Sequence, residues 1–452
     1  MIKLFFTFFL LLQTGLSTAT AKTTSTTEPN QLANYLEQAL AVNDTLRIAQ
    51  AEFRISTERT RLSGVLPDPK LAVQYYLEPV ETRTGPQNAS IGITQAVPWF
   101  NKLSLLHELS NHDAAISAAK LASVELDVAK DVKTAYIEYA FLGRSQQTIA
   151  ENIELLRYLE GVVRSRYISG KATFFDVLKI QIESARAEEK AVSLTDRATP
   201  LRVHINNLLG TEAERARPIP TQMPEVVLEE TEDRIHSLAL TNAPLLQGAR
   251  ERIAKARTGK ELAENNFFPD FSFSLKTIIT GNAEYGTPED SGKDPVIAGV
   301  NINLPIFRDR RHGAVAAQEA TISSAQSFQQ QQLRLLTTRI EQELYAYREA
   351  ERKLLLYRDD LLPKVKQQLE VAVNGFQSGE NSILELIDAE KSMLQFTLSK
   401  NRAMADQALA IARLESQTGI TLTTWSPNKK DDKKSTVRIA DLAFHSNLEM
   451  FL

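Results

Sequence analysis

The second half of the chain repeats the first. Five short motifs occur in the same order in both halves, at a spacing that drifts from about 200 to 209 residues. The matched segments are 39–46 with 238–245, 66–68 with 268–270, 97–100 with 304–307, 167–170 with 376–379, and 209–210 with 418–419. Five ordered matches indicate an internal duplication, so the fold must contain two similar units. We place the first repeat at residues 22–214, a proline-rich connector at 215–230 and the second repeat at 231–420.

The composition is that of a folded protein without a basic surface. The chain has 452 residues, a formal net charge of -4, 43% hydrophobic residues and 24% charged residues. This balance supports a large buried core and gives no support for a nucleic-acid partner. Cysteine is absent, which excludes disulfides, thiolate metal ligands and a lipid attached to an N-terminal cysteine.

The two ends of the chain have the composition of processing and tail segments. Residues 1–21 combine Lys3, a short apolar run and a small-residue ending, which predicts a signal peptide and export. The alternative is a membrane anchor, but the run is shorter than the roughly 20 residues that span a bilayer. No other segment is long and uncharged enough to be a spanning helix, so membrane insertion requires a β-barrel. The charged residues 421–452 predict a polar C-terminal tail.

Each repeat contains two segments in which apolar residues alternate with polar ones. The apolar positions are Leu71, Val73, Tyr75 and Leu77; Ile91, Ile93 and Val97; Phe271, Phe273, Leu275 and Ile279; and Val296, Ala298, Val300, Ile302 and Leu304. A period of two predicts strands, joined by loops at 78–88 and 281–294. Two interpretations are open: strands of an outer-membrane barrel with one side in lipid, or small soluble hairpins packed on the helices.

After each pair of strands comes a long helical pattern. Residues 101–169 and 310–378 contain few glycines, and only Pro363 interrupts either stretch. At 1.5 Å per residue each would reach roughly 100 Å. Each stretch turns at a glycine and returns through a second helix, at 173–209 and 382–418. The three-four spacing of apolar residues from Ile340 to Val373 is typical of antiparallel coiled-coil hairpins.

Four strands cannot close a barrel, because about eight is the practical minimum and lipid does not tolerate open strand edges. Several copies of the chain must therefore share one barrel. Three copies, each with four strands and four long helices, would supply a twelve-stranded transmembrane β-barrel and a twelve-helix α-barrel.

The order of elements resembles the TolC-type outer-membrane efflux channel family over residues 31–420. The corner Leu66-Pro67-Asp68-Pro69 and the run from Gln95 to Leu103 are similar to the branch that serves heavy-metal efflux, although the family prefers glycine where Asn101 stands. The resemblance implies a homotrimer in the outer membrane of a Gram-negative bacterium, with a large periplasmic portion. It also implies a periplasmic adaptor and an inner-membrane pump of the RND type as partners. The cargo would be metal cations or small toxic organic molecules.

The resemblance also assigns roles to the ends of the helical hairpins. The candidate tip and adaptor-contact residues are Tyr167, Gly170, Asp176, Phe376 and Gly379. Glu385 and Asp388 match two aspartates that ring the closed periplasmic entrance in the family. Three residues apart, they face one side of a helix, and a threefold axis would gather six carboxylates. The alternative is a solvated helix face. The first repeat has Asp176 and Lys179 at the matching positions, so only the second hairpin predicts an acidic gate.

The sequence contains no recognisable catalytic or cofactor motif. None of the six histidines pairs at the spacing that places two metal ligands on one helix face, and nucleophile-elbow and phosphate-loop motifs are absent. We therefore expect no enzyme activity, no cofactor and no resident metal. The main alternative to a duct is an elongated periplasmic coiled-coil scaffold without a pore, and an exported enzyme is a more distant one.

Overall fold

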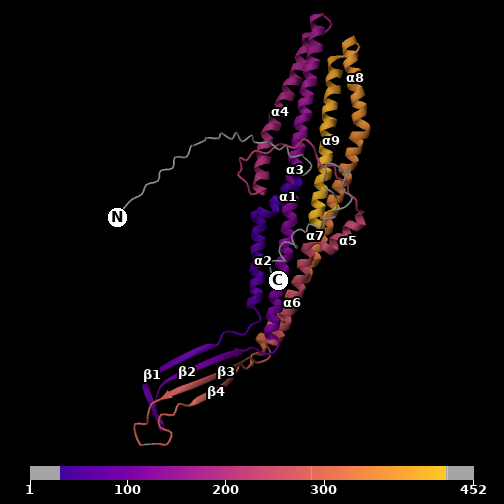
Figure 1. Ribbon diagram of the computed structural model, residues 1–452. Helices are drawn as coiled ribbons and strands as arrows, with labels where there is room; N and C mark the ends of the chain where they lie inside the picture. Colours follow the sequence, from indigo (N-terminus) through magenta and orange to yellow (C-terminus); the bar gives the residue numbers. More distant parts are fainter. Residues whose placement is uncertain (1–30, 287, 424, 426–452) are drawn as a thin grey trace, which may run out of the picture.

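The computed structural model describes residues 31–286, 288–423 and 425. A four-stranded sheet forms one end of an elongated molecule, and the helices extend from it along one direction (Figure 1). The predicted signal peptide lies outside the described residues, as does the predicted tail except for residues 421–423 and 425. Among the described helices, none combines the length and apolar character needed to cross a membrane.

The two halves have the same order of elements, as the internal repeat predicts. The first half consists of α1 (Gln31–Val42), α2 (Asp44–Leu62), β1 (Lys70–Thr82), β2 (Gly85–Val97), α3 (Lys102–Ile168) and α4 (Phe174–Leu208). The second half consists of α5 (Glu232–Asn242), α6 (Pro244–Asn265), β3 (Phe271–Thr280), β4 (Val296–Ile302), α7 (Arg308–Leu355), the π-helical η2 (Leu356–Leu361), α8 (Leu362–Ser378) and α9 (Ile383–Thr418). Residues 209–231, which we call the connector segment, contain no helix or strand and include the predicted connector.

The sheet is antiparallel throughout, in the order β1-β2-β3-β4. The strand prediction is confirmed, but the predicted loop at 78–88 is wrong. β1 and β2 stay paired to Thr82 and Gly85, where the Thr82 hydroxyl donates a 2.7 Å hydrogen bond to the Gly85 carbonyl oxygen. Pro79 suggested a loop, but it lies in the edge strand β1, where the register with β2 shifts. Proline is tolerated there because its missing N–H is not needed for a hydrogen bond between the strands.

The long helix of the second half is continuous from Arg308 to Ser378, with one π-helical segment just before Pro363. Proline lacks an N–H and its ring crowds the carbonyl four residues earlier, here that of Asp359. The wider π turn accommodates this crowding without breaking the rod. The matching helix α3 has 67 residues and no proline, and it extends about 100 Å.

The corner between the sheet and α3 depends on one unusual backbone conformation. Asn101 has φ 66° and ψ -12°, and among the described residues other than glycine it alone has a positive φ. This left-handed conformation costs most residues about 1–2 kcal/mol, and asparagine tolerates it better than most. Asn101 therefore occupies a position that would also suit glycine. Trp99 stacks on Phe268 beside this corner, with ring centroids 5.1 Å apart.

The helices pack around separate apolar clusters along the rod. One lies near the hairpin tips and joins α3, α4, α8 and α9, and another joins α3, α5, α6, α7 and α9 near the middle. In α9 the buried face is rich in small residues, which let neighbouring helices approach closely: Ala403, Ala405, Ala408, Ala410 and Ala412. We call the middle region, where the connector segment crosses the helices, the waist.

Candidate functional site: the sheet and the hairpin tips

One face of the sheet is apolar and exposed. The strand register places Leu71, Ile93 and Leu275 side by side in one row, and they are 69%, 48% and 52% exposed. The same face carries further exposed apolar residues: Val73, Tyr75, Ile91, Phe273, Ile279, Val296, Val300 and Ile302. A contiguous apolar surface of this kind indicates contact with lipid or another protein rather than with water.

The opposite face of the sheet carries polar side chains. Gln74 Oε1 accepts hydrogen bonds from Ser90 Oγ and Lys276 Nζ, each at 3.1 Å, across three neighbouring strands. Thr94 and Ser274 pair further along the same face. The sheet is therefore amphipathic, with one side suited to lipid and one side suited to water.

Both outer strands of the sheet have an unpaired edge. Within the described residues β1 pairs only with β2, and β4 pairs only with β3. Unpaired backbone groups are costly in an apolar environment, so edges beside a lipid-facing surface require further strands.

The first hairpin tip is a tight helix reversal. Gly170 has φ 72°, and Thr173 then begins α4 in a capping box with Asp176. The Thr173 backbone N–H donates to Asp176 Oδ2 at 2.7 Å, and the Asp176 N–H donates to Thr173 Oγ1 at 3.3 Å. Asp176 therefore has a structural role at the start of α4.

The second hairpin tip repeats this arrangement. Gly379 has φ 93°, and the N–H groups of Gly379, Glu380 and Asn381 all donate to the Gly375 carbonyl oxygen at 2.8–3.0 Å. Ser382 then begins α9 in a capping box, in which its backbone N–H donates to Glu385 Oε2 at 2.7 Å.

The two candidate gate carboxylates differ in their environment. Glu385 and Asp388 are both exposed on α9, but the Glu385 carboxylate is turned back to cap the helix. Asp388 has no ion pair or hydrogen bond within the part of the chain that the structure describes. Its carboxylate is thus the one free to face an ion, and the acidic gate stays a prediction.

Two of the predicted tip residues differ in exposure. Phe376 lies at the tip but is only 4% exposed, packed in the apolar cluster of the four tip helices, so it supports the tip and offers no contact surface. Tyr167 is 44% exposed, and its contact with an adaptor stays a prediction. Sequence reasoning missed the other exposed apolar side chains at the tips: Ile168, Phe174, Phe175 and Leu384.

Arg166 joins the two hairpin tips and was also missed. Its guanidinium on α3 donates to the carbonyl oxygens of Gln377 and Lys171, the latter at 3.0 Å, and lies 5.2 Å from the centre of the Phe376 ring. A side chain added at Gly379 would meet this guanidinium at 3.1 Å. Arg166 therefore ties the end of α3 to the end of α8.

Replacing Arg166 with alanine is expected to loosen the contact between the tips by about 2 kcal/mol, because hydrogen bonds from a charged donor are lost. Single-channel recording of the purified protein in planar bilayers should then show a higher closed-state conductance. Arg164→Ala is the matched control, since Arg164 is exposed on the same turn of α3. Equal conductance in the two variants would show that Arg166 does not hold the tips together.

A buried carboxyl group lies behind the tip. Glu390 on α9 is 2% exposed, and burial together with the charge of Glu183 raises its pKa, against the opposing effects of Asn152 and Lys391. Glu183 accepts hydrogen bonds from Lys391 at 2.8 Å and Arg186 at 2.9 Å. Lys391 and Arg186 are thus engaged by Glu183, and burial makes ionisation of Glu390 unfavourable.

The Glu390→Gln variant is expected to be more stable than the wild type at pH 8. This difference in stability should disappear as the pH falls to 4. The native pKa lies above the ordinary value of 4.5. The stability that the protonated carboxyl contributes is therefore present below that value and lost as the pH rises through the native pKa. Melting in detergent should show matching transitions for variant and wild type near pH 4 and a higher one for the variant at pH 8. Glu370→Gln, at an exposed position, should leave the melting transition unchanged at both pH values. A difference between Glu390→Gln and wild type that does not depend on pH would contradict the argument.

No group of three or more histidine, aspartate or glutamate side chains is placed to hold a metal ion in residues 31–286, 288–423 and 425.

An amphipathic sheet with free edges at the end of long helical hairpins is the architecture of an outer-membrane channel with a periplasmic extension. The sequence matches the family described as Outer membrane efflux protein over residues 35–211 and 235–420, and the chain belongs to this TolC family of efflux channels. Members are channels of the Gram-negative outer membrane and not enzymes, and they form trimers that work with efflux partners.

Two curated relatives illustrate the range of the family. The cobalt-zinc-cadmium resistance protein CzcC of Cupriavidus metallidurans is 21% identical over 373 residues, which cover 81% of this chain and 84% of CzcC. The pyoverdine export outer membrane protein OpmQ of Pseudomonas aeruginosa is 22% identical over 312 residues. That match covers 66% of this chain and 61% of the length of OpmQ.

Solved structures confirm the predicted fold class of long helices with four antiparallel strands. The outer membrane protein VceC of Vibrio cholerae superposes with a TM-score of 0.73 at 20% identity, over 86% of this chain and 96% of VceC. The structure of CusC superposes with a TM-score of 0.68 at 15% identity, over 87% of this chain and 92% of CusC.

Proposed function

We propose that three copies of this chain form one passive exit duct through the outer membrane, with a shared twelve-stranded barrel and a periplasmic tunnel of helices. The amphipathic sheet with two unpaired edges carries this proposal. Joining β1 of one copy to β4 of the next satisfies every edge and turns the row of Leu71, Ile93 and Leu275 toward lipid. A pore-free scaffold would leave this apolar face in water, so we set that alternative aside.

The hairpin tips are the surface on which a periplasmic adaptor and an inner-membrane pump of the RND type would act. Five exposed apolar side chains at the tips support such a contact: Tyr167, Ile168, Phe174, Phe175 and Leu384. Apolar side chains at the free end of a rod favour association with another protein surface. Asp388, and with it Glu385, would form the acidic ring at the entrance.

The cargo belongs to one of two classes, metal cations or small organic molecules. The name of CzcC refers to cobalt, zinc and cadmium, and that of OpmQ to pyoverdine. A conduit releases its cargo only if it binds it weakly. The absence of a metal-binding cluster from the described residues is therefore compatible with either class.

Disulfide trapping in the cysteine-free chain tests the shared barrel. One cysteine replaces Ala72 in β1, and a second replaces, in a series of variants, each residue of β4 from 296 to 302. Oxidation in the membrane should give covalent trimers for at least one spacing, since β1 and β4 of different copies would pair. Cysteines at Gly92 and Lys276, which are paired within one chain, should give only monomers. Monomers for every β1–β4 pair would contradict the shared barrel.

A further inference from the structure

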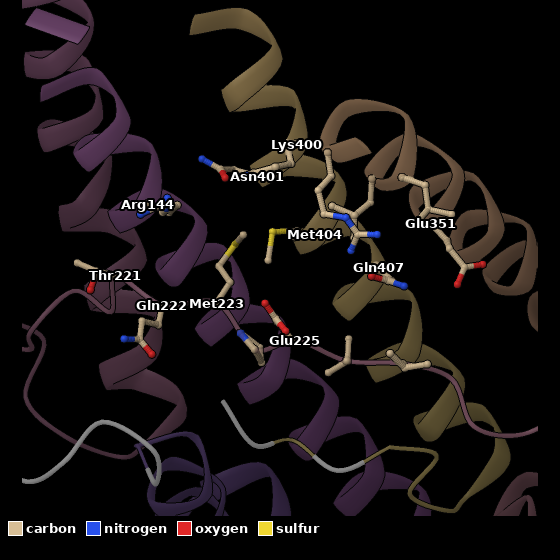
Figure 2. Close-up of a pocket in the computed structure, with 16 residues that line it drawn as sticks. Arg144, Thr221, Gln222, Met223, Glu225, Glu351, Lys400, Asn401, Met404 and Gln407 are labelled. Atoms are coloured by element: carbon tan, nitrogen blue, oxygen red, sulfur yellow. The ribbon is translucent and has the colours of Figure 1, made fainter. Parts of the chain in front are cut away.

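A cavity of about 610 Å³ lies at the waist, away from both the sheet and the tips. Its walls come from α3, the connector segment, the end of α7 with η2, and α9 (Figure 2). The connector segment is fitted closely to α3 beside it, because a side chain at Gly143 would lie 2.2 Å from the Pro220 carbonyl oxygen. The cavity therefore has a fixed wall on that side.

The middle of the cavity is apolar. Met223 from the connector segment and Met404 from α9 point toward one another across it in Figure 2. Val227, Leu354 and Leu355 also line the cavity. Methionine side chains adapt to ligands of irregular shape because they are unbranched and polarisable.

The charged side chains around this apolar centre are unevenly paired. Arg358 pairs with Asp359 at 2.7 Å and also feels the charge of the exposed Glu225. Glu351 accepts a hydrogen bond from the Tyr347 hydroxyl at 3.3 Å. Arg358 therefore already has an ion-pair partner, and Glu351 is held by the Tyr347 hydroxyl.

Lys400 and Arg144 are the cavity's two cations that form no ion pair among the described residues. Lys400 is half-buried, and within the described residues it makes no ion pair and no hydrogen bond. Arg144 donates only to Gln147, at 2.9 Å. Burial and the nearby Arg144 charge together lower the pKa of Lys400. An anion beside Lys400 would offset the desolvation of its ammonium and the repulsion from Arg144.

We propose that the waist cavity binds a small organic carboxylate, with its charged group at Lys400 and its apolar body between Met223 and Met404. The cavity volume lies within the range of about 300–1,000 Å³ that is typical of small-molecule sites. Because the walls come from both halves of the chain and from the connector segment, a bound ligand would hold them together. This site is distinct from the sheet and from the hairpin tips.

The first test uses charged thiol reagents, which the cysteine-free chain allows. In the assembled full-length protein with Met404→Cys, a negatively charged methanethiosulfonate should react about tenfold faster than a positively charged one, because the cavity attracts anions. Cysteine at Ser323, exposed on α7, supplies the reference ratio. Adding Lys400→Gln should return the ratio at position 404 to that reference, and adding Lys400→Arg should preserve the preference.

The second test asks whether a carboxylate occupies the cavity, with phenylacetate as the probe. Phenylacetate should slow labelling of Cys at position 404 in a saturable way, and Lys400→Gln should weaken this protection at least about fivefold. Absence of protection, or equal protection in the Lys400→Gln variant, would overturn the proposal. So would a cysteine at 404 that no reagent reaches, since a neighbouring copy would then fill the cavity.

Discussion

Replacing Lys133 with methionine is expected to cost about 3–5 kcal/mol, because it leaves the buried Glu415 carboxylate without its cation. The Lys133 Nζ and Glu415 Oε2 atoms are 2.5 Å apart, and both side chains are 3% exposed. Glu415 also accepts hydrogen bonds from the Leu422 N–H at 2.8 Å and from Trp425 Nε1 at 3.0 Å. The pair therefore ties α3 and α9 to the segment after α9 at the waist.

Thermal melting of the detergent-solubilised protein measures this loss. Lys120→Met is the matched control, because Lys120 and Glu52 are also 2.5 Å apart but are 61% and 46% exposed. Its cost should not exceed about 1 kcal/mol. The double change Lys133→Met with Glu415→Leu should recover most of the stability, since no charge remains buried. Equal losses at Lys133 and Lys120 would show that the waist pair is not a critical contact.

Neutralising the acidic residues near the tip of α9 is expected to raise closed-state conductance and weaken block by multivalent cations. For Asp388→Asn, the apparent affinity of a blocking divalent cation should fall about tenfold, which corresponds to about 1.4 kcal/mol. Glu385→Gln should have a smaller effect, because that carboxylate is engaged with Ser382 and glutamine can retain the cap. The double variant should show the largest change in single-channel recordings.

The first hairpin supplies the control for this prediction. Asp176 caps α4 as Glu385 caps α9, and Lys179 takes the position of Asp388. Lys179→Gln should therefore leave cation block unchanged, while Asp176→Asn should mainly affect stability. A loss of block in Asp176→Asn as large as in Asp388→Asn would contradict a gate formed by the second hairpin alone.

Periodic and short-range features of the fold were predictable from the sequence. The alternation of apolar and polar residues predicted the strands, and the scarcity of glycine predicted the long helices. Gly170 and Gly379 predicted the helix reversals, where both have a positive φ. The loop at 78–88 was mispredicted because prolines are common in loops, whereas an edge strand with a register shift also tolerates Pro79.

Contacts between distant segments were not predictable. Arg166 donates to the Gln377 carbonyl oxygen, 211 residues away, and a backbone acceptor leaves no mark in the side-chain pattern. From the sequence alone, a lysine such as Lys133 is expected at the surface. In the structure it is buried, because α9 places Glu415 beside it. Phe376 looked like a contact residue beside the tip glycine, but packing of four helices buries it. The capping boxes were readable at Thr173 and Ser382, and they would have indicated a structural role for Asp176 and Glu385.

The mass of the mature protein extracted from the outer membrane in mild detergent, corrected for bound detergent by light scattering, tests the duct most directly. The full chain has a mass of 50.5 kDa. Three chains without the predicted signal peptide should give roughly 145 kDa of protein. A protein that is extracted without detergent and has the mass of a single chain would contradict the shared barrel and the proposed duct.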